Sequence, residues 1–400
     1  MRKIFFTSGL FIASLIIVTF SFGQTLQLPT GFTSSIVAEG IGAARHIAVT
    51  KQGGIYVKLG RLKDGKGIIY LRDMKDGKFN QQLAFGDYPG TGICIKGNYL
   101  YASSNDDVYR YELDQNGAVT NPEKPEKIVT GLVNHNRDNS KSIAVDNNNN
   151  LYVNVGSYAN ACLINPPSKT APNPCPILDS VGGIWQFKAN KPNQQYKDAV
   201  HYATGFKNVV GLDWNTQTNS LFIMQHGRGD LHNLYPEFFT AAQDALLPAE
   251  TMYEVRKGAD GGWPYEYYDP AQHKKILAPE YGGNGKKAGT HKAIDPLVAF
   301  PAHLAPDGLL FYTGTRFPAK YKNGAFIAFH SKSTELQQGW LVAFVPFAHG
   351  KPSGKWEVFA DNFLAGKEQH KPCGLAQAPD GSIYITDDND GFVYKIQYGK

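Results

Sequence analysis

Short stretches of alternating apolar and polar residues recur along the chain, each interrupted by a turn rich in Gly, Asn or Asp. Alternation with a period of two residues, bounded by turn residues, is typical of antiparallel β-hairpins. Helical periodicity is nearly absent, so the pattern predicts an all-β protein. Six hairpin signatures cover residues 46–59, 92–104, 142–157, 211–227, 308–331 and 374–388.

The six hairpins predict a six-bladed β-propeller. Several are followed by a further strand, such as "DVYRYEL", "GGIWQFKA", "GWLVAFVPF" and "GFVYKIQY". Radial repetition of small antiparallel sheets produces a β-propeller. The strand at 32–40 has no hairpin of its own, so we expect it to complete the blade of the C-terminal strands and close the ring. A pair of β-sandwiches is the alternative, which the repeated hairpin disfavours.

One region departs from the β pattern. Residues 235–258 contain Pro236 and Pro248 at places suited to begin short helices, and residues 261–293 continue as a long loop. Long loops on a rigid scaffold commonly carry function. We therefore expect residues 24–400 to form one propeller domain with an insertion at about 235–293, partly helical and on the loop face.

The chain begins with features of a secretory signal peptide. Arg2 and Lys3 precede an almost wholly apolar run at 4–22, and Ser21 and Gly23 suit a cut after Gly23. Residues 1–23 are therefore predicted to be removed, leaving a periplasmic or secreted protein with no membrane association. An uncleaved anchor is the alternative, because the run approaches the length of a bilayer span.

The four cysteines are Cys94, Cys162, Cys175 and Cys373, and their spacing does not suit zinc. Cys162 and Cys175 flank a loop rich in Pro and Asn, so in an oxidising compartment we expect them to form a disulfide. Two free thiols remain the alternative, because pairing cannot be deduced from sequence.

Charge and motifs exclude several functions. The formal net charge is +5, and removal of Arg2 and Lys3 leaves +3. The remaining Lys and Arg are scattered, so nucleic acid is not an expected partner. The chain has no G-x-S-x-G elbow, H-E-x-x-H motif, Walker loop or EF-hand.

Polar residues at the ends of the predicted strands should meet at one mouth of the propeller channel. Lys and His predominate among them and acids are few, which suits a polyanionic ligand. These residues are His135, Lys141, Lys207, Asn208, His226, Arg228, Asp230, His303, Lys332 and Lys371.

The segments that carry these residues resemble the soluble PQQ-dependent sugar dehydrogenases, in particular the glucose/sorbosone dehydrogenase branch. The resemblance rests on "TGFKN", "HGR.DL", "GWP", "PAHLAPDGLLFY" and "KPCGLAQAPDG", and runs from residue 44 to residue 388. It implies a six-bladed propeller that uses PQQ and calcium to oxidise a sugar, an aldose or a sugar aldehyde. A His takes the proton while hydride passes to the quinone. An external electron acceptor such as a cytochrome is implied as a partner.

The resemblance assigns roles to five neighbouring residues. Lys207 and Asn208 lie where the family places Arg-Asn against the cofactor. Gly227 and Arg228 lie where backbone carbonyls meet the calcium, with His226 beside them.

Further cofactor contacts are implied at Lys371, where the family has an Arg against a cofactor carboxylate, and at Lys332, near another cationic position. The remaining candidates on the cofactor side are Lys141, Asp230 and His303.

Two residues compete for the catalytic base. His135 precedes the strand "SKSIAVD" as the family's His does, and imidazole titrates near neutral pH. The family's spacing is shorter, and at that spacing the residue is Asp138. Both stay candidates at this stage.

The chain departs from the family pattern in three places. Lys207 and Lys371 replace Arg, and Lys cannot make the planar bidentate contact to a carboxylate. Gly229 is inserted in the family's His-Gly-Arg-Asp run, which creates an Arg-Gly-Asp tripeptide. A carbohydrate-binding or adhesion propeller without a cofactor is therefore one alternative function, and a propeller lactonase is another.

Overall fold

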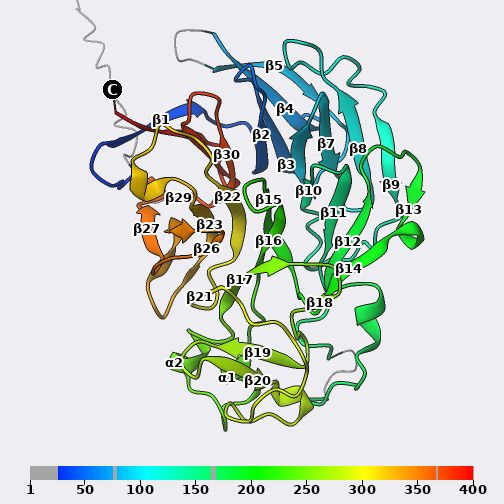
Figure 1. The fold of residues 1–400 in the computed structure, drawn as a ribbon, viewed down its shortest axis with the longest axis vertical. Helices are drawn as coiled ribbons and strands as arrows, with labels where there is room; N and C mark the ends of the chain where they lie inside the picture. Colours follow the sequence, from blue (N-terminus) through cyan, green and yellow to red (C-terminus); the bar gives the residue numbers. More distant parts are fainter. Residues whose placement is uncertain (1–25, 75–78, 164–167, 366–367, 400) are drawn as a thin grey trace, which may run out of the picture.

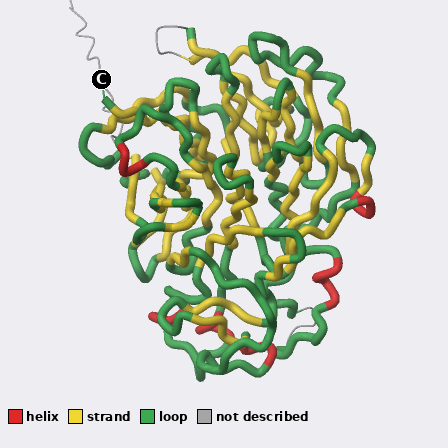
Figure 2. The backbone as a smooth tube through the Cα atoms, in the orientation of Figure 1, coloured by secondary structure: helices red, strands yellow, loops and turns green. Residues whose placement is uncertain are grey.

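The computed structural model describes residues 26–74, 79–163, 168–365 and 368–399. Six blade sheets surround a central axis, as predicted, and they are antiparallel except where a short added strand pairs in parallel in two of them (Figure 1). Strands dominate and the helices are short (Figure 2). The predicted signal peptide lies outside the described residues. Within those residues, no helix has the length and apolar character needed to span a membrane.

Each blade begins with its innermost strand. The first blade is β2 (Ala44–Val49), β3 (Ile55–Lys63), β4 (Lys66–Asp73) and β5 (Phe79–Phe85). The second is β6 (Ile93–Lys96), β7 (Tyr99–Ser103), β8 (Val108–Glu112) and β9 (Glu126–Thr130), with β13 (Gln194–Gln195) added. The third is β10 (Ile143–Val145), β11 (Asn150–Val155), β12 (Gly183–Lys188) and β14 (Val200–Thr204), with β18 (Ala259–Asp260) added.

The other three blades follow the same order. The fourth is β15 (Val209–Asn215), β16 (Ser220–Gln225), β17 (Glu250–Val255) and β21 (Val298–Phe300). The fifth is β22 (Pro306–Phe311), β23 (Ala325–Ser333), β24 (Gln338–Val345) and β27 (Glu357–Ala360). The sixth is β30 (Pro372–Gln377), β31 (Ile383–Asp387), β32 (Val393–Tyr398) and β1 (Phe32–Ala38).

The hairpin turns use residues that tolerate left-handed backbone. Asn149 has φ 56° between β10 and β11, and Asn219 has φ 53° between β15 and β16. Asn adopts this conformation more readily than most residues, which explains the Asn-rich turns of the sequence.

The ring closes through β1, as the sequence predicts. β1 pairs antiparallel with β32, with Phe32 opposite Tyr398. The Phe32 ring also packs against Phe317, Tyr321 and Phe359, with centroid distances of 4.8, 5.2 and 5.0 Å. One N-terminal side chain therefore joins the fifth and sixth blades.

The six inner strands contact one another in the cyclic order β2, β6, β10, β15, β22 and β30. Residues of these strands line a cavity of about 310 Å³, mostly with apolar side chains but also with His46, Lys96 and Asp213. Because each inner strand opens its blade, the loops that enter the blades reach the same end of this channel.

The predicted insertion divides in two around β17, which belongs to the fourth blade. Its elements form a lobe at one side of the ring (bottom of Figure 1). They are α1 (Leu231–Leu234), α2 (Ala241–Asp244), β19 (Glu266–Asp269), β20 (Lys274–Leu277) and a 3-10 turn at Pro279–Tyr281. Other short elements are 3-10 turns at Pro176–Asp179, Tyr196–Asp198 and Ala319–Tyr321, and the strands β25 (Phe347–Ala348), β26 (Lys351–Pro352), β28 (Leu364–Ala365) and β29 (Glu368–Gln369).

Replacing Phe32 should destabilise the whole ring. Phe32→Ala removes a buried ring from the closure, and we expect a loss of about 3–5 kcal/mol in the free energy of unfolding. Ile36→Ala is the matched control, because Ile36 lies on the same strand and is 39% exposed. Urea denaturation of both variants checks this, and equal losses would contradict a closure that depends on Phe32.

Candidate active site

A buried carboxylate, Asp307 on β22, joins residues from several blades at the channel end. Its oxygens lie 2.9 Å from Arg45 Nη2, 3.1 Å from His226 Nε2 and 3.8 Å from His330 Nδ1. Asp388 contacts the same Arg45 and His330 at 2.8 and 2.7 Å. Burial raises the pKa of Asp307, but the charges of Arg45 and the two histidines outweigh burial and hold that pKa well below its usual range.

His46 extends this group into the channel. Its Nε2 lies 2.8 Å from the Asp307 carbonyl and must donate, because a carbonyl only accepts. Burial, together with the neighbouring Arg45 charge, lowers the pKa of His46 to about 4. His46 is therefore neutral near pH 7.

A second group of polar residues joins the third and fourth blades. Lys207 is 4% exposed, and its ammonium lies 2.5 Å from Asp138 Oδ2. Asn154 donates to both Asn208 Oδ1, at 3.0 Å, and the Ser140 carbonyl, at 2.8 Å. The predicted residues Asp138, Lys207 and Asn208 are thus brought together.

Lys141 is also buried beside this group, with 1% of its surface exposed. Its ammonium donates to the Asn139 carbonyl at 3.0 Å and to Asn139 Oδ1 at 2.5 Å. Burial lowers the pKa of Lys141 to about 8, so an anion placed beside it would favour the charged form.

His135, the other candidate base, lies on the outer side of this loop. The residue is exposed, and its ring centroid is 4.2 Å from that of Tyr158. It is the more solvent-accessible of the two candidate bases, whereas Asp138 is already bound to a cation.

The turn at Gly227 and Arg228 presents backbone oxygens. His226 N donates to the Asn208 carbonyl at 2.9 Å, and Gly227 N donates to Glu250 Oε2 at 2.7 Å. A Cβ at position 227 would lie 2.5 Å from the Pro248 carbonyl oxygen, so only Gly fits there. Within residues 26–74, 79–163, 168–365 and 368–399, neither the Gly227 nor the Arg228 carbonyl accepts a hydrogen bond.

The Arg228 side chain points into the insertion. It is 5% exposed and forms a buried ion pair with Glu280. Asp230, two residues later, has φ 69° and accepts a hydrogen bond from Asn160 Nδ2 at 3.2 Å. Because Arg228 is buried, the Arg-Gly-Asp tripeptide cannot present both charges to a receptor.

Three other predicted residues make contacts outside the groups described so far. His303 Nε2 donates to the Asp244 carbonyl at 2.8 Å, which ties it to the insertion. Lys332 Nζ lies 5.4 Å above the centroid of the Trp340 ring. Lys371 N donates to Asp387 Oδ1 at 2.6 Å, and among the described residues its ammonium has no ion-pair partner.

The Asp307 group was not identified from the sequence, although Asp307 itself lies in the segment "PAHLAPDGLLFY". The sequence signal that could have revealed this group is a charged or imidazole side chain at the point where an inner or second strand meets the channel mouth. Four segments show it: "ARHIAV", "APDG", "AFHSKS" and "TDDND". The missed residues are Arg45, His46, Glu250, Asp307, His330 and Asp388.

The residues present fit a polyanionic cofactor and a hard cation. Lys141 and Lys207 are buried cations at the mouth, and the two carbonyls of the Gly227 turn are the oxygen type that calcium prefers. His226 Nε2 and Asp307 Oδ1 are buried and lie 3.1 Å from each other, and neither atom has a further hydrogen-bond partner among the described residues. Unsatisfied buried polar atoms mark a place where a polar ligand or water binds favourably.

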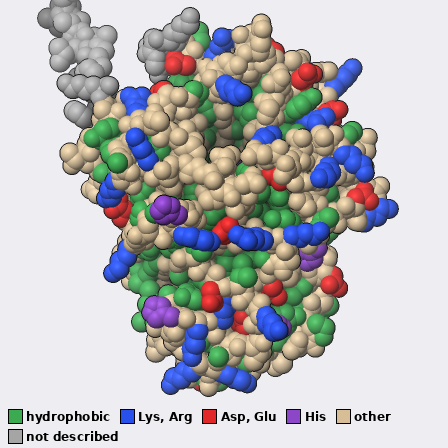
Figure 3. Space-filling view, in the orientation of Figure 1, with side chains coloured by type: hydrophobic (Ala, Val, Ile, Leu, Met, Phe, Trp, Pro, Cys, Tyr) green, Lys and Arg blue, Asp and Glu red, His purple; other side chains and the backbone are tan. Residues whose placement is uncertain are grey.

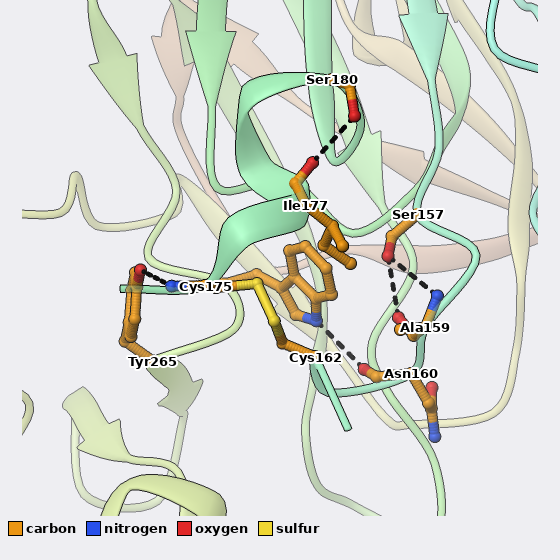
Figure 4. Close-up of a disulfide and its surroundings, with 9 residues drawn as sticks. Ser157, Ala159, Asn160, Cys162, Cys175, Ile177, Ser180 and Tyr265 are labelled. Atoms are coloured by element: carbon orange, nitrogen blue, oxygen red, sulfur yellow. Dashed lines mark hydrogen bonds between the residues drawn. A yellow bond between two sulfur atoms is a disulfide. The ribbon is translucent and has the colours of Figure 1, made fainter. Parts of the chain in front are cut away.

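The predicted disulfide is present in the long loop between β11 and β12. Cys162 and Cys175 are bonded, and Cys175 N donates to the Tyr265 hydroxyl at 2.8 Å (Figure 4). The indole of Trp263 donates to the Asn160 carbonyl at 3.0 Å. The loop between β11 and β12 is therefore tied to the insertion through Tyr265 and Trp263.

Surface charge on the visible face is mixed. Lys and Arg side chains are spread over that face with Asp and Glu among them (Figure 3). The basic residues important for the site are instead the buried ones of the channel mouth.

Comparisons with known proteins agree with this architecture. The model of a family described as TrAA12-like matches residues 26–266. An uncharacterised protein from Borreliella burgdorferi is 25% identical, with 98% of this chain and 96% of the relative covered. A pyrroloquinoline quinone-dependent sugar dehydrogenase from Hypocrea jecorina is 22% identical, with 92% and 88% covered.

Solved structures share the fold. The calcium structure of a Trichoderma reesei enzyme of family AA12 has a TM-score of 0.75 at 18% identity, with 94% of this chain and 98% of that chain covered. The holo form of the PQQ domain of pyranose dehydrogenase from Coprinopsis cinerea has a TM-score of 0.74 at 18% identity, with 94% and 97% covered. At this identity the structures support the fold alone.

Breaking the Arg228–Glu280 pair should be costly. Glu280→Gln leaves a buried guanidinium unpaired, and we expect a loss of about 3–5 kcal/mol in unfolding free energy by urea denaturation. The double variant Arg228→Met with Glu280→Met should recover most of this loss, because it removes both charges. Glu237→Gln on the exposed surface is the control, and an equal effect there would contradict the buried pair.

His46 should make the protein acid-sensitive. The pKa of His46 is lower in the folded than in the unfolded chain. The contribution of neutral His46 to folding stability is therefore complete above pH 6.5 and is lost as the pH falls toward 4. Between pH 7 and pH 5, His46 should lower the free energy of unfolding of the wild type by roughly 2 kcal/mol. The His46→Gln variant should not show this loss. Thermal and urea unfolding at both pH values test this, with His349→Gln as the exposed control. Identical pH dependence in wild type and His46→Gln would refute it.

Proposed function

The chain belongs to the TrAA12-like family, and from this premise we propose that it is an exported PQQ-dependent oxidoreductase acting on a sugar, an aldose or a sugar aldehyde. The observation that carries the proposal is the channel mouth. Lys141 and Lys207 are buried there, Lys207 is close enough to His226 to influence its charge, and the Gly227 and Arg228 carbonyls accept no hydrogen bond from the described residues. The curated relative from Hypocrea jecorina, described as a PQQ-dependent sugar dehydrogenase, supports the same chemistry.

The proposed cofactors are PQQ and calcium. When bound, PQQ supplies the two-electron oxidation of the substrate carbon and calcium polarises the quinone. Lys207, Lys141 and Lys371 would hold the cofactor carboxylates, each as a point charge, since Lys cannot form the bidentate contact of Arg. The carbonyls of Gly227 and Arg228 would hold the calcium.

Neighbouring side chains would orient the cofactor from several sides. The Asn208 side chain is fixed by Asn154, so its amide is positioned before any ligand arrives. His226 is held next to the turn proposed to bind calcium. Its backbone N–H donates to the Asn208 carbonyl, and its imidazole contacts the Asp307 carboxylate. Asp230, His303 and Lys332 would contribute from the rim.

We propose Asp138 as the base, with His135 as the alternative. Asp138 is half-buried and forms an ion pair with Lys207, so its carboxylate would lie beside the proposed cofactor site. It would take the hydroxyl proton as two electrons leave the substrate carbon. Positioned general bases of this kind contribute roughly 10²–10⁴-fold to the rate.

The other proposed functions have less support. Display of the Arg-Gly-Asp tripeptide requires an exposed Arg228, which is buried. A lactonase would use acidic side chains at the mouth to hold calcium, but Asp307 and Asp388 are already paired with Arg45. Export agrees with the Cys162–Cys175 disulfide, since disulfides persist in oxidising compartments.

Reconstitution tests the proposal directly. Purified protein is titrated with PQQ in the presence of calcium, and dye reduction is followed with a panel of sugars and sugar aldehydes. We expect saturable micromolar binding and sugar-dependent reduction that is lost with EDTA. Lys207→Met should weaken PQQ binding at least about tenfold because a buried charge-assisted contact is removed. Exposed Lys355→Met is the matched control.

The base is assigned by two variants in the same assay. Asp138→Asn should lower kcat at least about 100-fold with the PQQ spectrum retained. A comparable loss in His135→Ala instead would place the base at His135. Absence of saturable PQQ binding by the wild type would contradict the proposed function as a whole.

A further inference from the structure

Tyr158 is a large aromatic side chain that stays exposed at the edge of the proposed site. It follows β11, is 36% exposed, and its ring centroid lies 4.2 Å from that of His135 at an interplanar angle of 51°. His135 is itself exposed. Two rings from different loops thus form one aromatic surface facing solvent, which we name the Tyr158–His135 platform.

The loop that carries Tyr158 is fixed on both sides of the ring. Ser157 Oγ donates to the Ala159 carbonyl at 2.9 Å and accepts from Ala159 N at 3.1 Å. Asn160 Nδ2 donates to the Gly229 carbonyl at 3.3 Å, and Cys162 is held by its disulfide (Figure 4). Because the backbone is tethered, ordering this aromatic surface on binding costs little entropy.

The platform is joined to the proposed cofactor residues. Ser157 N, next to Tyr158, donates to the Lys207 carbonyl at 2.7 Å. Gly156 packs so closely that a Cβ there would lie 2.2 Å from the Asp138 carbonyl oxygen and 2.5 Å from Asn208 Oδ1. The segments of the platform, the proposed base and the proposed cofactor contacts therefore touch one another at the mouth.

An exposed aromatic face beside polar groups suits one class of ligand. A pyranose ring has an apolar C–H face that stacks on an aromatic ring and hydroxyl groups that need hydrogen-bonding partners. The Tyr158 hydroxyl has no hydrogen-bond partner within the described chain, so it is available to a sugar hydroxyl. The buried lysines would bind the anionic groups of the proposed cofactor, whereas the platform offers a surface suited to an uncharged ring.

We propose that the Tyr158–His135 platform is a sugar-binding subsite that stacks a pyranose ring and fixes which hydroxyl reaches the base. The inference rests on the proposed function, because it assigns the substrate's place relative to Lys207 and Asp138. Tyr158 is a specificity-determining residue on this account, and His135 supports its ring.

Steady-state kinetics separate binding from chemistry. Tyr158→Ala should raise KM about 3- to 10-fold for pyranose substrates, as expected for loss of one aromatic contact, with kcat changed less than about twofold. Tyr158→Phe keeps the ring and should stay within about twofold of wild type if stacking dominates. Phe238→Ala is the control, since Phe238 is an exposed aromatic residue on the insertion, 41% exposed.

Calorimetric titration of glucose and cellobiose into cofactor-free protein separates this inference from the proposed function. Weaker sugar binding by Tyr158→Ala than by wild type supports the subsite even if PQQ fails to bind. Equal affinity and equal KM in wild type and Tyr158→Ala overturn the subsite while leaving PQQ-dependent turnover intact. A wild type that neither binds nor oxidises any sugar overturns both.

Discussion

The pairing of β1 with β32 is the constraint on which the site depends. Six blades each present the start of an inner strand to the channel, and these starts converge only when the ring is closed. Phe32 packs against aromatic rings of the fifth and sixth blades, so the two ends of the chain are held in one core. Arg45, Asp307 and Asp388 come from three different blades, and their ion pairs exist only under that closure.

Within the closed ring, the acidic and the basic residues at the channel mouth have different roles. Asp307 and Asp388 form ion pairs with Arg45 and contact the imidazoles of His226 and His330 at the channel end. Lys207 is paired with the carboxylate of Asp138, whereas the ammonium of Lys141 donates to the uncharged side chain of Asn139. Burial lowers the pKa of Lys141, and an anionic ligand would reverse that effect. The insertion also shapes the mouth, because its Glu280 forms an ion pair with Arg228 and so holds that side chain away from the mouth.

Much of the fold could be predicted because hairpin periodicity and turn residues are local signals. The six hairpins, the closing strand and the Cys162–Cys175 bond are confirmed. The insertion was less predictable, since β17 lies within it and joins the fourth blade through non-local pairing. The sequence pointed to the mouth but not to the partners there. Asp307 sits in an ordinary "APDG" turn-like motif, and only the closed ring shows that it meets Arg45 and His226.

The central claim is that this mouth holds PQQ and calcium together. A crystal structure of the protein soaked with both tests it most directly. The account predicts the quinone at the channel end, its carboxylates beside Lys207 and Lys141, and calcium bound by the Gly227 and Arg228 carbonyls. Density for the quinone elsewhere, or a cation that avoids these carbonyls while PQQ occupies the mouth, would contradict the account.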